Sequence, residues 1–247
     1  MVQTEVKEVT CHVNSVERIK DHVYRVQLDT FLEPRPAFFA GQYLSINMPG
    51  REAPYFFSIA SRPELETIEL HVQADPHLES AVEMIDYLTL SVNNRSRVSI
   101  SLPYGQACLT DMPASPIILL AAGTGFAQMK SIVEHLHYHH YAHPVSLYWG
   151  VRKKNDMYLK SLARTWAEQS AHFHFSPLIA NIDDHQGVKH HSQMADAVLA
   201  DHPDLAHSRV FVSGSPKLVF SAMEVLLDAG LPKQQFFSDV LEHTETN

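Results

Sequence analysis

Two glycines lie where a chain can bind phosphate. In "LLAAGTGFAQMKS", Gly123 and Gly125 follow the apolar run "PIILLAA" and precede a helical pattern. Glycine allows a tight turn and close approach of the backbone, and a helix N-terminus offers free N–H groups with a partial positive charge. The third glycine of a dinucleotide fingerprint is replaced by Gln128, and Met129 precedes Lys130-Ser131, which does not fit a P-loop. A nucleotide site and a simple tight turn both remain open here.

A second turn of the same kind favours the nucleotide site. In "VFVSGSPKLVF", Gly214 follows an apolar strand pattern, Ser215 can cap the next helix, and Pro216 suits its first turn. Two strand–helix turns can line the same carboxyl edge of a parallel sheet, where ligands bind. We therefore predict that both turns contribute to one nucleotide site.

Aromatic and hydroxyl side chains gather in "PYFFSIAS", from Pro54 to Ser61. Taken alone, this stretch is an apolar strand that ends in hydroxyls, and core packing explains it. The alternative is the wall of a site for a flat ligand, with the aromatic rings along its face and a serine at its edge.

Histidines and basic residues form two further clusters. In "HLHYHHYAH", His135, His139 and His143 follow i, i+4 spacing, which suits a metal, but no carboxylate or cysteine accompanies them in this run. The chain has 17 histidines, and cations suit a helix C-terminus, so we predict no metal. The run from Arg152 to Lys154 could accept the 2′-phosphate of NADPH, or it could be a solvated loop.

The elements that must position these residues fall into two domains. Residues 1–110 show mostly alternating strand patterns and one amphipathic helix around 78–88, which fits a small barrel or sandwich. Residues 111–247 alternate buried strands with helices, which indicates a doubly wound parallel sheet. Helices are expected at 126–139, 156–169, 192–200 and 216–230, and the last strand at 235–241.

Composition narrows the function. The 19 basic residues against 28 acidic ones give a net charge of −9, which argues against a general nucleic-acid binder. No apolar run is long enough to span a membrane, and no signal segment opens the chain. Two cysteines can form neither a disulfide framework nor a four-cysteine cluster. We expect a reduced, cytoplasmic protein.

Three signatures, taken in order, resemble the ferredoxin–NADP reductase superfamily: "AGQYLSI" with "YFFSIAS", then "AAGTGFAQMKSI", then "YWGVRKKNDMYL" with "VFVSGSPKL". Within it, the chain is similar to single-chain NAD(P)H:flavin oxidoreductases, including those that supply reduced FMN to bacterial luciferase. The resemblance implies an N-terminal antiparallel flavin-binding β-barrel, a C-terminal NAD(P)H domain, and hydride transfer from nicotinamide C4 to flavin N5. Besides flavin and NAD(P)H, it implies as partner a flavin-dependent acceptor enzyme.

The resemblance also implies roles for individual residues. Ser58 matches the serine that faces flavin N5 and is the expected catalytic residue. The residues matching the flavin site are Tyr55, Phe56, Phe57, Ser58, Ile59, Ala60, Ser61, Leu70, His71, Val72 and Phe237. Those matching the NAD(P)H site are Gly123, Thr124, Gly125, Arg152, Ser213, Gly214, Ser215 and Pro216.

Departures from the family pattern bear on how flavin is held. Tyr55 stands where the family has an arginine that anchors the flavin phosphate or ribityl chain, and Arg51 or Arg62 are the candidate substitutes. The Gly-x-x-Ser/Thr turn of FAD-holding members is absent, and Ser213 replaces a frequent cysteine. We therefore expect FMN, FAD or riboflavin as an exchanging substrate. The alternatives are a tightly held flavin that serves an iron–sulfur or haem partner, and a non-catalytic sensor.

Overall fold

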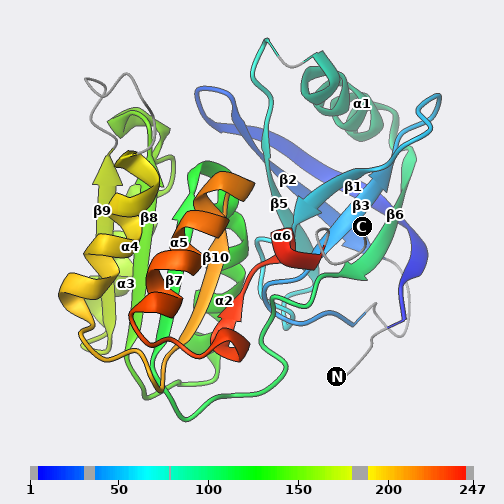
Figure 1. Cartoon of the computed structure of the whole chain (residues 1–247). Coiled ribbons are helices and arrows are strands. Elements are labelled where there is room, and N and C mark those ends of the chain that lie inside the picture. The colour runs from blue at the N-terminus through cyan, green and yellow to red at the C-terminus, as the bar shows by residue number, and fades with distance from the viewer. Residues whose placement is uncertain (1–4, 31–36, 78, 180–188, 243–247) are drawn as a thin grey trace. The chain divides into compact units, whose positions relative to one another are not determined.

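The computed structural model describes residues 5–30, 37–77, 79–179 and 189–242, which fall into two compact units (Figure 1). Unit 1 comprises Met1–Thr110 and Lys130–His139, and unit 2 comprises Asp111–Met129 and His140–Asn247. Helix α2 (Phe126–Tyr138) therefore begins in unit 2, and the rest of it belongs to unit 1.

Unit 1 is built on a six-stranded antiparallel sheet. Its strand order is β4-β3-β6-β1-β2-β5, and an isolated bridge between Ile59 and Leu70 joins the two edge strands into a barrel. This confirms the antiparallel barrel expected for the N-terminal half. The strands are β1 (Lys7–Lys20), β2 (Val23–Thr30), β3 (Tyr43–Asn47), β4 (Tyr55–Ser58), β5 (Thr67–Gln73) and β6 (Arg97–Tyr104).

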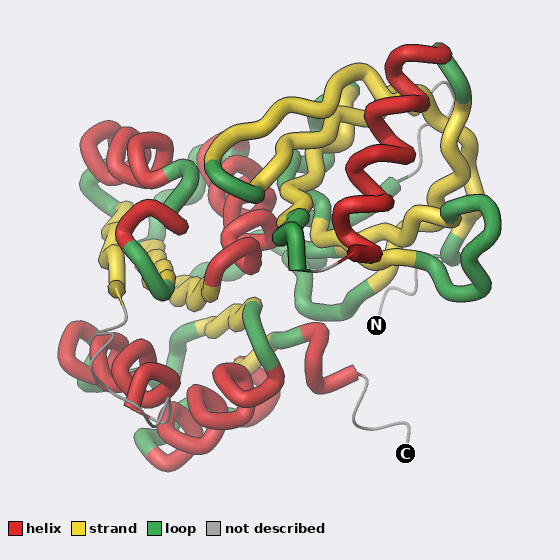
Figure 2. Tube along the Cα trace, turned by 90° about the horizontal axis from the view of Figure 1, so that it is seen from above, coloured by secondary structure: helices red, strands yellow, loops and turns green. Residues whose placement is uncertain are grey.

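The core of unit 1 follows from strand alternation. In β1, Val9, Cys11 and Val13 are buried while the residues between them are not, as one buried face requires. Helix α1 (Glu79–Asn94) lies across these strands and adds Met84 and Leu88 to the same core (Figure 2). The helix is one and a half turns longer than the sequence pattern predicted at its C-terminal end.

Unit 2 is a parallel five-stranded sheet in the order β11-β10-β7-β8-β9, with helices on both sides of it (Figure 2). Residues Ile117–Ala121 of β7 are all buried, which explains the uninterrupted apolar run. The doubly wound fold is thereby confirmed. The strands are β7 (Ile117–Ala122), β8 (Val145–Val151), β9 (Phe173–Ile179), β10 (Arg209–Ser213) and β11 (Phe236–Phe237); the helices that follow α2 are α3 (Lys160–Gln169), α4 (Lys189–Asp201), α5 (Pro216–Asp228) and α6 (Asp239–Glu242).

Two predicted elements of unit 2 are shorter than expected. The helix predicted at 156–169 begins only at Lys160, because a 3₁₀ turn (Lys154–Asp156) comes first. The strand predicted at 235–241 is two residues long and gives way to α6. At the start of α6, Asp239 accepts a hydrogen bond from the Gln128 side chain at 3.1 Å.

The strand order creates a topological switch point at β7. Strand β7 lies between β8 and β10, so the connections that leave β7 and β10 turn to opposite sides of the sheet. The crevice at the carboxyl ends of two such strands is where open α/β sheets bind ligands. Both predicted glycine turns lie at this edge. Among the described residues, no helix combines the length and apolar composition needed to cross a membrane.

Candidate active site

The two glycine turns of unit 2 touch each other. A Cβ on Gly125 would lie 2.4 Å from the carbonyl oxygen of Ser213, and one on Gly214 would lie 3.0 Å from Ala122 Cβ. Gly123 has a φ of +54°, in the left-handed region that other residues rarely adopt. The turns after β7 and β10 therefore need glycine for close contact as well as for backbone conformation.

Neighbouring side chains fix both turns. Ser215 caps α5 by accepting a hydrogen bond from Leu218 N at 3.4 Å, and Pro216 is the first helical residue, as the sequence predicted. Thr124 sits within the 3₁₀ turn Gly123–Gly125. Trp149 Nε1 donates to the Gly123 carbonyl at 3.0 Å, and its buried indole stacks on Phe126 with 3.8 Å between ring centres.

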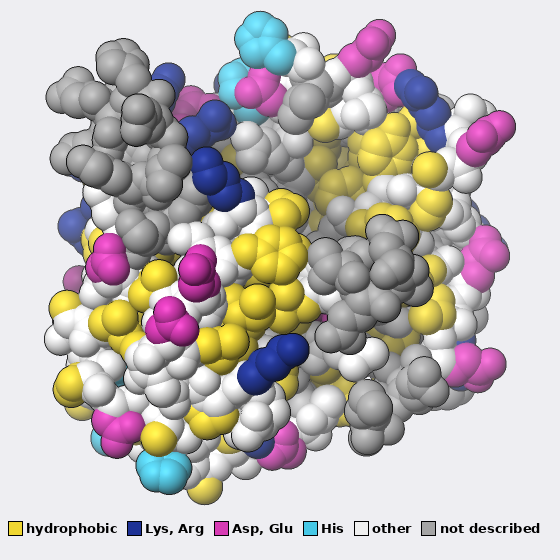
Figure 3. Space-filling model, in the orientation of Figure 1, with side chains coloured by type: hydrophobic (Ala, Val, Ile, Leu, Met, Phe, Trp, Pro, Cys, Tyr) yellow, Lys and Arg dark blue, Asp and Glu magenta, His cyan; other side chains and the backbone are white. Residues whose placement is uncertain are grey.

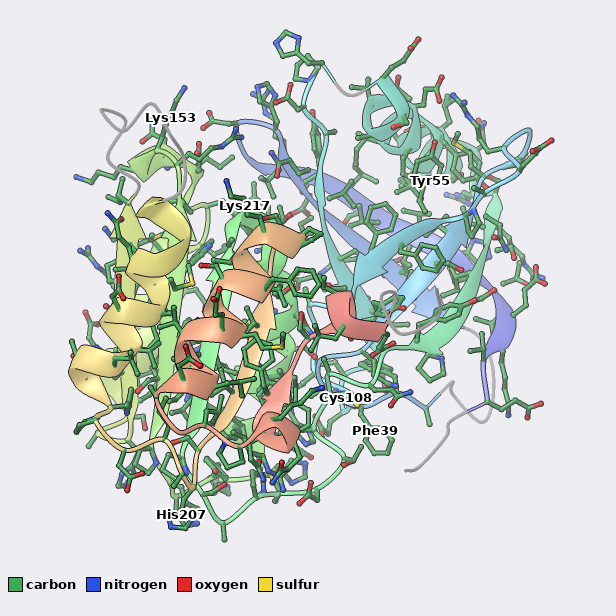
Figure 4. The ribbon with its side chains drawn as sticks, viewed as in Figure 1. Phe39, Tyr55, Cys108, Lys153, His207 and Lys217 are labelled. Carbon is green, nitrogen blue, oxygen red and sulfur yellow. The ribbon has the colours of Figure 1, made fainter. Side chains whose placement is uncertain are left out.

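Basic side chains surround this edge of unit 2. Arg152 and Lys153 are exposed just after β8, where Lys153 N donates to Asp156 Oδ2 at 3.0 Å. Lys217 is exposed on the first turn of α5, and Figure 4 shows Lys153 and Lys217 at the edge where β8 and β10 end. The sequence analysis missed Lys217, although its position directly after Gly-Ser-Pro was an available signal. Cations near helix N-termini provide a binding environment for nucleotide phosphates.

Side-chain contacts help to hold the C-terminal segment of unit 2. Gln128, which replaces the third fingerprint glycine, is 1% exposed and donates to Asp239. The Phe237 ring stacks on Phe211 at 4.8 Å, with 18° between the ring planes. The contact of Phe237 with flavin stays a prediction.

In unit 1, strand β4 presents two faces of different character. Tyr55 and Phe57 pack against the barrel core, whereas Phe56 is 54% exposed and Ser58 is half-buried on the opposite face. Of the predicted flavin-site residues of β4, only Phe56 and Ser58 therefore share this outer face. Tyr55, labelled in Figure 4, packs against the core. It therefore cannot take the place of an arginine on the outer face without leaving the core.

Two tyrosines complete an aromatic surface around Ser58. Tyr43 pairs with Ser58 across β3–β4 and with Tyr104 across β3–β6. The rings of Tyr43 and Tyr104 stack at 5.5 Å, and the Phe56 ring meets them edge-on at 5.8 Å and 5.5 Å. Figure 3 shows hydrophobic side chains at the surface in the upper right of the view, where unit 1 lies. The sequence analysis missed both tyrosines, because only strand pairing brings residues 43, 58 and 104 together.

The other predicted flavin-site residues of unit 1 are buried. Ile59, Ala60 and Leu70 have no exposed surface, and Val72 is 1% exposed. Ile59, Leu70 and Val72 belong to the core of unit 1, so the flavin contacts implied for these residues stay predictions. The His71 side chain is likewise buried, with Nε2 2.7 Å from Glu69 Oε1.

The segment that follows Ser58 is fixed by hydrogen bonds from α2 and β5. Lys130 Nζ donates to the Ala60 carbonyl at 3.2 Å, and Ser131 Oγ donates to the Ser61 carbonyl at 2.7 Å. Ser61 Oγ accepts from Glu69 N at 3.0 Å. Lys130 and Ser131 are therefore structural residues of unit 1 here, in agreement with the absence of a P-loop.

A buried ion network supports Lys130. Its ammonium lies 2.9 Å from Glu134 and 3.4 Å from Glu69, and Arg25 lies 3.5 Å from Glu69. Burial would raise the pKa of Glu69, but the hydrogen bond from His71 and the charge of Lys130 outweigh it and lower the pKa to about 2. Burial lowers the pKa of His71, although Glu69 opposes this effect. Burial raises the pKa of Glu134, although Lys130 opposes that effect.

Comparison with known proteins gives consistent results. Residues 119–223 match the oxidoreductase NAD-binding domain family. A probable flavin reductase of Photobacterium leiognathi is 32% identical over 95% of this chain and 98% of its own length. An NAD(P)H-flavin reductase of Aliivibrio fischeri is 30% identical over 94% of this chain and 97% of its own. The chain belongs to the NAD(P)H-flavin reductase family.

This flavin reductase chain is also similar to reductases that are named for other enzyme systems. A reductase component of terephthalate 1,2-dioxygenase from Comamonas is 30% identical over 95% of this chain and 68% of its own length. Among solved structures, an Amycolatopsis cytochrome P450 reductase has a TM-score of 0.76 at 23% identity, covering 97% of this chain and 71% of its own. The structural likeness confirms the ferredoxin–NADP reductase type of fold.

Proposed function

We propose that this chain catalyses the reduction of free flavin by NAD(P)H. The observation that carries the proposal is the aromatic cluster in which the exposed Phe56 meets the half-buried Tyr43 and Tyr104, with Ser58 at its edge. Aromatic rings with hydroxyl groups beside them suit an isoalloxazine ring, and the chain is a member of the flavin reductase family. The chemistry supplied by the two bound cofactors is transfer of a hydride, with its electron pair, from nicotinamide to flavin.

Three features support flavin as an exchanging substrate. Tyr55, at the family arginine position, packs against the core of unit 1. Of the candidate substitutes, Arg51 forms an ion pair with Glu83, and Arg62 lies 4.0 Å above the Tyr138 ring. Since these groups already have partners, a flavin phosphate gains little from them, and the ring contacts provide most of the affinity.

Ser58 is the proposed catalytic residue. Its hydroxyl lies on the outer face of β4, where it can exchange a hydrogen bond with the edge of a flavin ring. The network that holds residues 60 and 61 limits movement of the strand end, so the hydroxyl is oriented before substrate binds.

The nicotinamide cofactor is proposed to bind at the carboxyl edge of unit 2. Gly123, Thr124 and Gly125 offer backbone N–H groups to the pyrophosphate, and the turn from Ser213 to Pro216 lies directly beside them. Arg152, Lys153 and Lys217 supply positive charge for further phosphates. These basic side chains support use of NADPH. The glycine turns bind the pyrophosphate, so they serve NADH and NADPH equally.

Substitution of Ser58 tests the assignment. Ser58→Ala is expected to lose most of the flavin-dependent NAD(P)H oxidation, about 100-fold in kcat, because a positioned hydrogen-bonding group is removed. Ser58→Thr keeps the hydroxyl and suits a strand, so it should retain far more activity. The flavin Kd of both variants should stay close to that of the parent. Equal turnover by Ser58→Ala and the parent would remove Ser58 from the catalytic role.

A second function is favoured by the dioxygenase reductase relative: delivery of electrons from a tightly held flavin to a separate protein. With two free cysteines, this chain would depend on a partner for any iron–sulfur cluster. Gel filtration separates the two functions, because a tightly held flavin leaves the purified chain yellow and an exchanging flavin does not.

A cytoplasmic location is also proposed, based on the cysteine content.

A further inference from the structure

Two neighbouring histidines and a glutamate from a distant part of the sequence meet on unit 1. His135 and His139 lie one turn apart on α2, and Glu64 comes from the loop between β4 and β5. His135 Nδ1 is 2.7 Å and His139 Nε2 is 2.9 Å from the same oxygen, Glu64 Oε1. No carboxylate lies within the histidine run from His135 to His143, which argued against a metal there, but the fold provides one from 71 residues away.

The geometry of this cluster suits a small divalent cation. The three ligand atoms all lie within 4.8 Å of one another. A tetrahedral Zn²⁺ with ligands at about 2.0–2.2 Å needs ligand atoms about 3.4 Å apart, so side-chain adjustments of under about 1 Å are enough. The two imidazole rings are inclined at 65° with their centres 4.5 Å apart, so both can direct a ring nitrogen at a common point.

The electrostatic environment of this cluster is also compatible with a bound cation. Glu64 Oε2 is buried and accepts no hydrogen bond from the described residues, which is unusual for a carboxylate oxygen. Burial would raise the pKa of Glu64, but the hydrogen bonds from His139 and His135 lower it overall. Burial lowers the pKa of His135. Arg62, whose Nη1 lies 3.8 Å from Glu64 Oε2, is a positive charge that opposes a bound cation.

We propose that Glu64, His135 and His139 form a binding site for a divalent transition metal, with Zn²⁺ as the reference ion. Two imidazoles and one carboxylate are a ligand set that Zn²⁺ uses, and three protein ligands leave the fourth position to water. The bound ion ties α2 to the loop that follows β4. Because the ligands are in place only in the folded chain, metal binding stabilises unit 1.

The test is a titration of the full chain with Zn²⁺ against a chromophoric chelator. We expect one tight equivalent, weakened at least tenfold in His135→Ala, His139→Ala and Glu64→Gln. The matched control is His140→Asn, which removes a neighbouring histidine from the same run and tolerates its φ of +53°. This control should keep the tight equivalent unchanged. Co²⁺ should give a tetrahedral absorption spectrum in the parent chain but not in Glu64→Gln.

Thermal unfolding provides a second measurement that needs no activity. Zn²⁺ should raise the unfolding midpoint of the parent chain and of His140→Asn, but not that of Glu64→Gln. Glu64→Gln keeps the size and the acceptor oxygen of the parent side chain, so it should fold even if a histidine variant does not. A tight equivalent that persists unchanged in all three ligand variants would place the metal on other histidines of the 17 and overturn the proposal. Absence of binding at about 100-fold molar excess of Zn²⁺ would overturn it too.

Discussion

The candidate sites of the two units are built from different parts of the chain. In unit 2, the candidate site is made of backbone atoms from two short turns, and each turn is a continuous stretch of sequence. In unit 1, the site consists of side chains from three strands, and the residues that hold it come from α2, 70 positions away. A site made of backbone leaves a short motif in the sequence, whereas a site made of side chains depends on the pairing of distant elements.

If unit 1 depends on its buried ion network, removal of Lys130 should have the largest effect. Lys130→Met leaves Glu69 and Glu134 buried without their shared cation, and we expect the free energy of unfolding to fall by about 3 kcal/mol. Urea unfolding at neutral pH measures this. Lys7→Met, an exposed lysine of β1, should change it by less than about 0.5 kcal/mol. Equal effects of the two variants would show that the network contributes little.

The same network should respond to acid. Because the pKa of Glu69 is lowered to about 2 in the folded chain, its stabilisation is complete above about pH 5 and is lost as the pH falls through 4 towards 2. Glu69→Gln should therefore cost about 2 kcal/mol at pH 7, and this cost should shrink as the pH is lowered. Urea unfolding of both chains between about pH 7 and pH 3 gives the difference directly. A cost that is independent of pH would contradict the role assigned to the carboxylate charge.

In unit 2, a change of one backbone position should be enough to disturb the site. Gly125→Ala places a methyl group 2.4 Å from the Ser213 carbonyl, so the two turns must move apart. We expect KM for NAD(P)H to rise about tenfold, equivalent to about 1.4 kcal/mol, while flavin Kd stays unchanged. Gly230→Asn is the control, because nothing lies within 4 Å of its Cβ position and asparagine tolerates its φ of +97°. A rise in flavin Kd with a normal KM for NAD(P)H would show that the turn binds flavin and not NAD(P)H.

The smallest effect is expected on the aromatic surface of unit 1. Phe56→Ala removes one exposed ring, and we expect flavin to bind about fivefold more weakly, or about 1 kcal/mol. Stability should change little, since the ring is 54% exposed. Phe220→Ala, which removes an exposed ring from α5, should leave flavin affinity as it is. Flavin titration by fluorescence quenching compares the three chains, and equal affinities would exclude this surface.

The sequence was sufficient for most of the fold and for half of the candidate site. Buried apolar runs such as Ile117–Ala121 identify the parallel strands, and the glycine turns follow them directly. The bounds of strand β1 have no local signal, because its polar and charged second half continues the strand without an alternating pattern. Tyr43 and Tyr104 escaped recognition, since cross-strand pairing has no local signature. Glu64 escaped for the same reason, and with it a ligand set that changes the interpretation of the histidine run.

Flavin reduction is tested by the oxidation of NADH and NADPH by the purified chain, with and without riboflavin, FMN or FAD. We expect a colourless protein that oxidises reduced nicotinamide slowly alone and at least about tenfold faster with added flavin, with the rate saturating in flavin. A rate that does not depend on any added flavin would exclude free flavin as the substrate.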